Sequence, residues 1–450
     1  MTGPFPFSPE ATAQMLAWVS ERLQRGPDPT HGAQTVAALD RSMAGAITDD
    51  GRGWDRAFAL FTDTVLPATR PFGHPSSLAF VASAPTHAAL SFDAALGAAG
   101  IFAGNWDGGA GAIHAENQVL RWCADLAGWP ASAGGVFVAG GTLGNLSALH
   151  AARARARRKR AGQVPARWKV LCSTEAHSSI HAACEVMDVD AVTVSPDAQG
   201  RMSAAAASAA LAEPDAFFAI VANAGATNSG AVDDLAGLAQ LAHEHGLWLH
   251  VDGAYGLAAM ADPAARPQFA GIEGADSLIV DPHKWLFAPY DSCALVYRDA
   301  ADGRAAHGQS AVYLDALAPD RFNPSDYALH LTRRARGLPL WFSLVTHGTG
   351  AYARAIARTI ATARQIADGI AATDGLELLL GPQLTVILFR ATAMTDSDMD
   401  AWAEIHRRSG ALLCLPTGWA GQKVFRLCIV NPATDADEVL AVLRTMVPAP

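Results

Sequence analysis

The sequence predicts an α/β fold with a mostly parallel central sheet and helices on both faces. A helical segment precedes this unit and a small α+β domain follows it. Short apolar runs alternate with helical patterns through the middle of the chain, as parallel sheets require. The 450 residues are half hydrophobic and only 17% charged, which fits a large buried core rather than disorder. The alternation is absent before about residue 70 and after about residue 345.

The elements are expected in this order. In the helical segment, residues 1–70, the amphipathic stretch QMLAWVSERL follows PFSPE, whose Ser and Pro favour a helix start. The large α/β domain, residues 71–344, has helices such as VDDLAGLAQLAHEHG between its runs. The small domain, residues 345–450, combines the Ala-rich helix ARAIARTIATARQIADGIA with the strands TVILFR and FRLCIV. The expected strands of the large domain are GVFVAG (135–140), KVLCS (169–173), AVTVS (191–195), FFAIVANAG (217–225), LWLHVD (247–252) and DSLIVD (276–281).

Composition excludes several classes of protein. A formal charge of −10 gives no general attraction to nucleic acid or to an anionic membrane. No stretch approaches the roughly 18 uninterrupted apolar residues of a membrane span. The start, MTGPFPFSPE, lacks the basic and apolar regions of a signal peptide, and the six cysteines form no CxxC pair. We therefore expect a soluble cytoplasmic protein with reduced thiols.

Two conspicuous clusters favour structural interpretations. The basic run RARARRKR (153–160) is typical of the exposed face and end of a helix, so we do not expect a nucleic-acid site. His243, His245 and His250 superficially suggest a metal. Gly246 separates them as a helix stop, with His250 on the next strand, so no metal site is expected.

Three expected strand ends carry unusual residues, and ligands of open α/β sheets bind at such ends. AGGTLGN (139–145) is a glycine-rich turn that opens a helix, where free N–H groups and the Thr142 hydroxyl suit a phosphate. HVDGAYG places Asp252 at the end of an apolar strand. DPHKWLFAPYD (281–291) places Lys284 just after the apolar run SLIV. A buried lysine is costly unless its nitrogen is used or its charge removed.

Each strand end alone also has a structural interpretation. Asp252 and Lys284 could form a buried ion pair, the carboxylate could cap a turn, and Gly and Thr often merely begin helices. Together, a phosphate cup, an acid and a strand-end lysine are the anchors of pyridoxal phosphate: the lysine binds its aldehyde as an imine and the acid keeps its ring nitrogen protonated. Such a site can lower the pKa of a free lysine from its usual value of about 10.4.

With these residues in view, the chain resembles the group II pyridoxal-phosphate-dependent amino-acid decarboxylases. This family includes the aromatic-L-amino-acid, glutamate, aspartate and diaminobutyrate decarboxylases. The resemblance runs from about residue 70 to residue 435. DPHKWL, with HVDGAY upstream, carries most of it, and AGGTLGN supports it. It implies the fold type I architecture of pyridoxal-phosphate enzymes, with the cofactor in the large domain.

The family pattern implies a role for each matching residue. Lys284 matches the lysine that binds the cofactor, and Asp252 the partner of its ring nitrogen. Ala254 matches the small residue against one ring face. His177, in EAHSSI, matches the histidine stacked on the other face, which also helps to position the substrate. The surroundings of the phosphate are matched by Gly141, Thr142 and His283.

Two further stretches resemble family segments. NWDGGAGAIHAENQVLRW (105–122) resembles the segment lining the substrate mouth, although His114 and Ala115 stand where a Thr–Glu type sequence is usual. YLDALAPDRFNPSDYALHL (313–331) resembles the catalytic loop. Its tyrosine, placed at Tyr327, implies proton return to the substrate carbon after carbon dioxide leaves. A phenylalanine there marks the related aldehyde synthases.

We therefore expect decarboxylation of an L-amino acid to its amine by a homodimer with the active site at the interface. An aromatic substrate is the first hypothesis and an acidic one the second. Candidate substrate-binding residues are Phe80, Trp106 and His114, with Phe102 as a further aromatic side chain near the mouth. Open alternatives are an aldehyde synthase or carbon–carbon lyase, an aminotransferase, and a scaffold that binds the cofactor without turnover.

Overall fold

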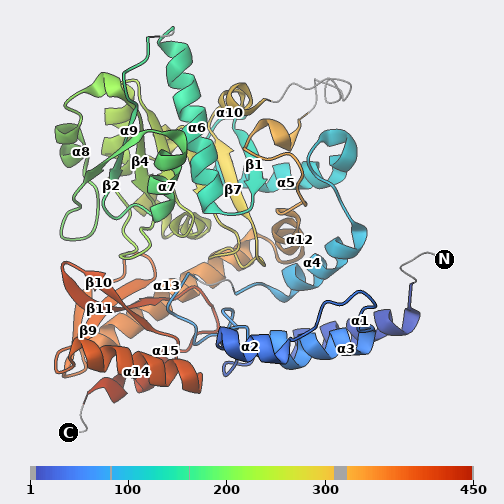
Figure 1. The fold of residues 1–450 in the computed structure, drawn as a ribbon. Coiled ribbons are helices and arrows are strands. Elements are labelled where there is room, and N and C mark those ends of the chain that lie inside the picture. The colour runs from blue at the N-terminus through green and yellow to red at the C-terminus, as the bar shows by residue number, and fades with distance from the viewer. Residues whose placement is uncertain (1–6, 82–83, 162, 309–321, 448–450) are drawn as a thin grey trace.

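The computed structural model describes residues 7–81, 84–161, 163–308 and 322–447. Its largest element is a seven-stranded sheet of order β1-β7-β6-β5-β4-β2-β3, in which only β7 runs antiparallel to its neighbours (Figure 1). The predicted mostly parallel α/β fold is thus confirmed. The strands are β1 (Gly134–Val138), β2 (Lys169–Ser173), β3 (Asp190–Val194), β4 (Phe217–Asn223), β5 (Trp248–Asp252), β6 (Ser277–Val280) and β7 (Cys293–Tyr297).

Strand β7 is the element of this sheet that the sequence pattern did not predict. It lies between β1 and β6 and pairs with both, with Cys293 opposite Val138 and Ala294 opposite Val280. Its sequence, CALVY, is a fully buried run without polar alternation, and five such residues give no periodic signal. Because β7 is antiparallel, its first residue lies at the edge of the sheet where β6 ends.

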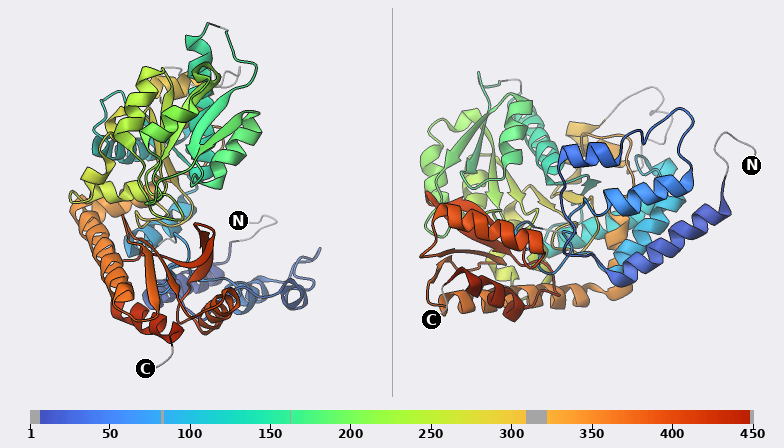
Figure 2. Two further views of the ribbon diagram at one scale, coloured as in Figure 1. Left: turned by 90° about the vertical axis from the view of Figure 1, so that its left-hand side faces the viewer. Right: turned by 60° about the horizontal axis from the view of Figure 1, so that its bottom comes forward.

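Helices cover both faces of the sheet (Figures 1 and 2). Alternate side chains of each strand enter different cores: Leu249 and Val251 of β5 pack on one face and Trp248 on the other. One face is covered by α6 (Gly141–Lys159), α7 (Ser178–Met187) and α10 (Ala300–His307), and the other by α5 (Trp106–Leu126), α8 (Ala204–Ala210) and α9 (Leu235–Glu244).

The N-terminal segment is helical, as predicted. Ser8 caps its first helix by accepting a hydrogen bond from the backbone N–H of Ala11 at 3.1 Å, and Pro9 is the first helical residue. These helices lie along one side of the molecule, away from the seven-stranded sheet (Figure 2). They are α1 (Pro9–Arg25), α2 (Val36–Ser42), α3 (Trp54–Leu60) and a π-helical turn (Phe61–Val65), followed by α4 (His87–Ala99).

A second, antiparallel sheet of order β10-β11-β9-β8 forms the C-terminal part. The predicted Ala-rich helix and the two predicted strands are present, and β8 and β10 are additional. Residues 73–79 run along this part, where the Leu78 N–H donates to the Leu413 carbonyl at 2.9 Å. The elements are α12 (Leu338–His347), α13 (Thr349–Ala371), β8 (Leu376–Leu380), β9 (Val386–Ala391), α14 (Asp396–Ser409), β10 (Leu415–Trp419), β11 (Gln422–Cys428) and α15 (Ala436–Leu443), and short 3₁₀ turns cover Pro214–Ala216, Gly256–Ala261, Arg266–Phe269, Ile272–Gly274, Pro324–Asp326 and Arg444–Met446.

The basic run 153–160 and the three histidines His243, His245 and His250 lie in different surroundings. In the basic run, Arg155 forms an ion pair with Asp276 at 2.6 Å and Arg158 pairs with Asp302 at 3.0 Å. His243 and His245 are exposed around the end of α9, whereas His250 is buried on β5. Across the described ranges, no helix is both long and apolar enough to cross a membrane.

A buried ion pair joins the chain that follows residue 322 to α5. The Arg333 guanidinium meets both carboxylate oxygens of Glu116, at 2.6 and 2.7 Å, and both side chains are almost completely buried. Two further contacts hold the pair: Arg333 donates to the Ala103 carbonyl at 3.0 Å and Glu116 accepts the Gly337 N–H at 2.8 Å. Nε of Arg333 has no hydrogen-bond partner among the described residues. One pair therefore fixes three backbone segments near the predicted substrate mouth.

Replacing Glu116 by Gln should lower the free energy of unfolding by about 3–5 kcal/mol, because the Arg333 charge stays buried without its counter-charge. Urea denaturation of the purified protein measures this change. The matched control is Asp125→Ala, which removes a partner of Arg121 in a more exposed pair and should cost at most about 1 kcal/mol. Equal effects of the two substitutions would contradict this interpretation of the pair.

Candidate active site

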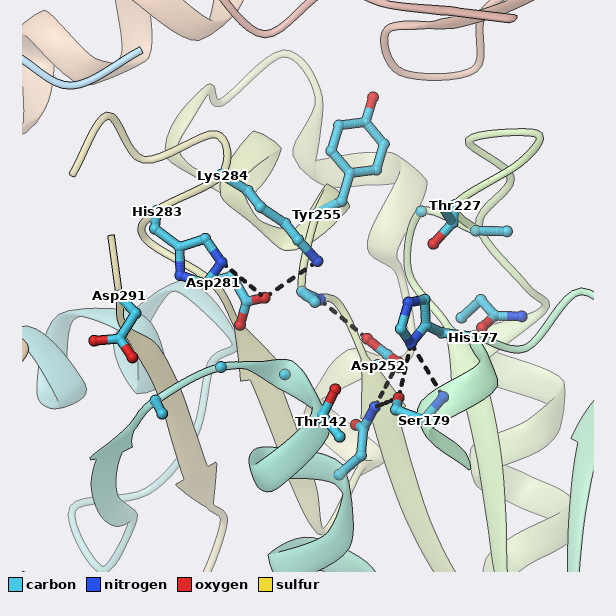
Figure 3. A pocket seen from close by; sticks show the side chains of 18 of the residues that line it. Thr142, His177, Ser179, Thr227, Asp252, Tyr255, Asp281, His283, Lys284 and Asp291 are labelled. Atoms are coloured by element: carbon cyan, nitrogen blue, oxygen red, sulfur yellow. Dashed lines mark hydrogen bonds and ion pairs between the residues drawn. The ribbon is translucent and has the colours of Figure 1, made fainter. Parts of the chain in front are cut away.

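A cavity of about 330 Å³ opens at the edge of the large sheet where β1, β4, β5 and β6 end (Figure 3). The carboxyl ends of parallel strands share one edge, so loops distant in sequence meet there. The cavity is lined by Ala139, Gly140, Gly141, Thr142, Asn145, His177, Ser179, Asn223, Gly225, Ala226, Thr227, Asp252, Ala254, Tyr255, Asp281, His283, Lys284, Tyr290 and Asp291.

Lys284 lies in the loop between β6 and β7, in a tight turn closed by its N–H and the Asp281 carbonyl at 2.9 Å. Its Nζ lies 3.1 Å from Oδ2 of Asp281, whose side chain is only 2% exposed. Burial alone would lower the pKa of Lys284. The carboxylates of Asp281 and Asp252 together outweigh burial, so the net pKa shift is upward. The expectation of a lowered lysine pKa is therefore wrong for the protein without cofactor, because two acids face this amine.

Asp252 is the last residue of β5 and is 7% exposed. Two N–H donors hold its carboxylate: the Asn145 side chain donates to Oδ2 at 2.9 Å, and the Ala254 backbone donates to Oδ1 at 3.2 Å. These two hydrogen bonds hold both carboxylate oxygens in place at the cavity wall. The carboxylate is thus prepared to receive a cationic group from the cavity.

His177 is the N-cap of α7, on the side of the cavity where β2 ends. Its Nδ1 accepts the backbone N–H of Ser179 at 3.2 Å and lies 2.9 Å from the Ser179 hydroxyl. These contacts fix the plane of the imidazole at the cavity wall, as Figure 3 shows.

The glycine-rich turn leads from β1 into α6. Among the described residues, no side chain caps the first turn of α6. Gly141 fits closely, since a Cβ there would lie 3.2 Å from Oδ2 of Asp281 and 3.4 Å from Cβ of Ala254. Bare N–H groups at the start of a 19-residue helix suit an anion. His283 stands beside the turn, with its ring held by the backbone of Ser292.

The structure brings together every residue predicted to surround the cofactor: Gly141, Thr142, His177, Asp252, Ala254, His283 and Lys284 all line the cavity. Sequence reasoning missed other lining residues. Asn145 and Asp281 belong to quoted motifs, AGGTLGN and DPHKWL, and could have been found there. Asn223 lies near the end of the predicted strand 217–225 and Thr227 follows that strand, so the strand-end argument applies to both.

Tyr327 is not in the cavity. It is 7% exposed, its ring stacks on Phe322 with 4.5 Å between centroids, and its carbonyl accepts the Tyr297 hydroxyl at 3.0 Å. Burial of a large aromatic side chain explains this placement. Tyr327 is thus packed within its own chain and away from the cavity lining, and its role as the proton donor stays a prediction. The quoted stretch contains one other tyrosine, Tyr313, which lies outside the described residues.

The predicted substrate-binding residues also lie outside this cavity. Phe80 is 48% exposed and meets Phe72 edge to face, at 5.4 Å between centroids. Trp106 begins α5, and His114 is exposed on the same helix. Within this chain, none of the three contributes to the cavity lining.

Residues 42–392 match the family model described as "Pyridoxal-dependent decarboxylase conserved domain". An aromatic-L-amino-acid decarboxylase of Bacillus atrophaeus is 30% identical over 422 residues, 90% of this chain and 87% of that protein. An L-2,4-diaminobutyrate decarboxylase of Rhizobium meliloti is 31% identical over 414 residues, 88% of this chain and 82% of that protein. The crystal structure of Oryza sativa TDC with PLP and tryptamine superposes with a TM-score of 0.89 at 22% identity, covering 98% of both chains.

The cavity fits pyridoxal phosphate. An amine, a carboxylate and a glycine-rich helix start match its aldehyde, ring nitrogen and phosphate. Two buried polar atoms of the lining, Nδ2 of Asn223 and Oδ1 of Asp281, have no hydrogen-bond partner among the described residues, as expected where a polar ligand completes a site. With the family model matching most of its length, the chain belongs to the pyridoxal-dependent decarboxylase family and is an amino-acid decarboxylase with pyridoxal phosphate as its cofactor.

Proposed function

We propose that this enzyme converts an aromatic L-amino acid into its amine and carbon dioxide. The observation that carries the proposal is the 30% identity to an aromatic-L-amino-acid decarboxylase over 90% of this chain. The lining supports it, with the rings of His177, Tyr255 and Tyr290. An acidic substrate would need a cation for its second carboxylate. The described lining contains no arginine, and its one lysine, Lys284, serves the cofactor.

A second candidate substrate is 2,4-diaminobutyrate, because a decarboxylase of that amino acid is 31% identical to this chain. Its side-chain ammonium would require a carboxylate at the mouth. Asp291 lines the cavity, but its Oδ1 lies 3.1 Å from Nε of Arg336, so an ion pair already occupies it. This pairing favours the aromatic substrate over the cationic one.

The first task of the protein is to bind and release the cofactor through Lys284. When bound, pyridoxal phosphate supplies an electron-poor ring that takes up the electron pair left by departing carbon dioxide. Lys284 can bind an aldehyde only with Nζ unprotonated, whereas its raised pKa keeps the proton on. Oδ2 of Asp281, at 3.1 Å, is placed to accept this proton and to return it.

The second task is to stabilise charge and to orient the substrate. Asp252 holds a proton at the cofactor's ring nitrogen and so stabilises negative charge that develops during bond cleavage. His177 borders the same cavity and holds the substrate so that the bond to the departing carboxylate is the one that breaks. A tyrosine of residues 313–331 then returns a proton to the substrate carbon. With Tyr327 packed away, Tyr313 is the remaining tyrosine of that stretch.

The proposed enzyme is a homodimer. Large apolar side chains of α1 and α2 face solvent in the single chain, including Leu16 at 63% and Val36 at 76% exposure. Contact with a second subunit would remove this surface from water. Such a contact would also give Phe80 and Trp106, which miss the cavity of their own chain, a role at the cavity of the partner subunit.

Incubation of the purified enzyme with each of the twenty amino acids and pyridoxal phosphate tests the function. We expect carbon dioxide and an amine in equal amounts from an aromatic amino acid, and no keto acid. Lys284→Ala is the matched control, and should lose both turnover and the adduct that borohydride traps in the parent protein. Aldehyde with ammonia would indicate the aldehyde synthase, and bound cofactor without any product would indicate the inactive scaffold.

The two tyrosines predict different products. Tyr313→Phe should shift the product from amine toward aldehyde, because the proton donor is lost. Tyr327→Phe should leave the product an amine, since its hydroxyl lies outside the cavity. Chromatography of the product mixture separates these outcomes. A shift caused by Tyr327→Phe alone would restore the original assignment.

The dimer is tested by sedimentation velocity. Leu16→Asp, on α1, should shift the protein from dimer toward monomer, because the new charge would be buried at the interface. Ile405→Asp is the control, since Ile405 is also 63% exposed but lies on α14. If the two variants formed dimers of equal stability, α1 would not belong to the dimer interface.

A further inference from the structure

A chain of buried hydrogen bonds runs beneath the cavity and ends on Asp252. The indole Nε1 of Trp248 lies 2.8 Å from Oγ of Ser277, and that oxygen lies 2.8 Å from Nδ1 of His250. Nε2 of His250 lies 2.8 Å from Oδ1 of Asn145, whose Nδ2 donates to Asp252. All five residues are at most 7% exposed, so water does not compete for these bonds.

The direction of every bond in this chain is determined by its ends. A carboxylate only accepts, so Asn145 must present its NH₂ to Asp252 and its oxygen to His250. His250 therefore carries a proton on Nε2. At the other end, an indole N–H only donates, which leaves the hydroxyl hydrogen of Ser277 for Nδ1 of His250. Each member donates toward Asp252, and aligned donors polarise one another.

His250 is consequently neutral. Burial lowers the pKa of His250 to about 4, although the nearby charge of Asp252 acts in the opposite direction. A cationic imidazole would partly neutralise the carboxylate through Asn145. Because the hydrogen-bonded residues from Trp248 to Asn145 are all neutral, the negative charge of Asp252 stays available to a group in the cavity.

A second branch leaves Asn145 for His177. The other hydrogen of Nδ2 is donated to Oγ of Ser179 at 2.9 Å. The Ser179 hydroxyl is then free to donate to Nδ1 of His177 at 2.9 Å, where the Ser179 N–H also donates. Nδ1 is thus an acceptor, and neutral His177 carries its proton on Nε2. One amide group therefore orients two side chains that border the cavity (Figure 3).

We infer that Asn145 is a positioning residue that orients the carboxylate of Asp252 directly and the ring of His177 through the Ser179 hydroxyl. The inference deepens the proposed function and rests on it for the roles of these two residues. The side-chain amide of Asn145 makes three hydrogen bonds, each to a different buried partner. A purely apolar residue of similar volume would fill the same space without orienting either side chain.

The test replaces Asn145 by Leu and measures pyridoxal phosphate binding by the protein without substrate. Loss of a hydrogen bond to a charged group should weaken binding about tenfold to hundredfold. The ¹⁵N signal of the ring nitrogen of labelled cofactor should move toward that of an unprotonated pyridine. Ser277 lies two hydrogen bonds from Asn145. Ser277→Ala should therefore move the ring-nitrogen signal in the same direction and weaken cofactor binding about threefold.

The control is Asn431→Leu, which removes a partly buried asparagine that is bonded to the Gly73 carbonyl and does not line the cavity. It should leave affinity and ring signal unchanged. An unchanged ring signal in folded Asn145→Leu would overturn the inference. If circular dichroism shows that Asn145→Leu does not fold, Ser277→Ala decides in the same way. Failure of the parent protein to bind the cofactor through Lys284 would instead overturn the proposed function.

Discussion

The carboxylate buried at the end of β5 is the constraint on which the site depends. An ion so placed is costly unless donors and a counter-charge surround it. Asn145 and the Ala254 N–H supply the donors. Among the described residues the counter-charge is incomplete, because Asp252 and Asp281 face a single ammonium, that of Lys284. A heterocycle with a protonated nitrogen would restore the balance, which gives a physical reason for the cofactor to fit here.

The sequence predicted most of the sheet and most of the cofactor surroundings. The strand that ends at Asp252 and the strand SLIV were predictable because short buried apolar segments differ from the helical patterns between them. β7 escaped because five buried residues carry no periodicity. Asn145 lies in the quoted motif AGGTLGN, but the motif alone did not single it out, because its hydrogen-bond partners Ser179, His250 and Asp252 are far away in sequence. Tyr327 is buried in its own chain, and local sequence does not tell a packed aromatic side chain from a reactive one.

The residues proposed for the cofactor and those proposed for the substrate lie in different parts of the molecule. The residues proposed to hold the cofactor line one cavity at the edge of one sheet, where they follow the ends of paired strands. The residues expected to meet the substrate, such as Phe80 and His114, have exposed side chains and belong to segments outside the large sheet. Strand pairing does not constrain these segments. Proteins that share the sheet edge can therefore differ in substrate, and similarity to the family is more informative about the reaction than about the amino acid.

The antiparallel direction of β7 has a consequence for how the reactive lysine is held. Since β6 ends and β7 begins at the same edge, the loop with Asp281, His283 and Lys284 is tethered to the sheet at both ends. The same loop returns past the cavity with Tyr290 and Asp291. Attachment to two paired strands restricts the backbone of the loop and so limits the positions that the lysine backbone can take. Lys284 and the lining residues Tyr290 and Asp291 belong to the same loop, so an insertion in this loop would disturb all three at once.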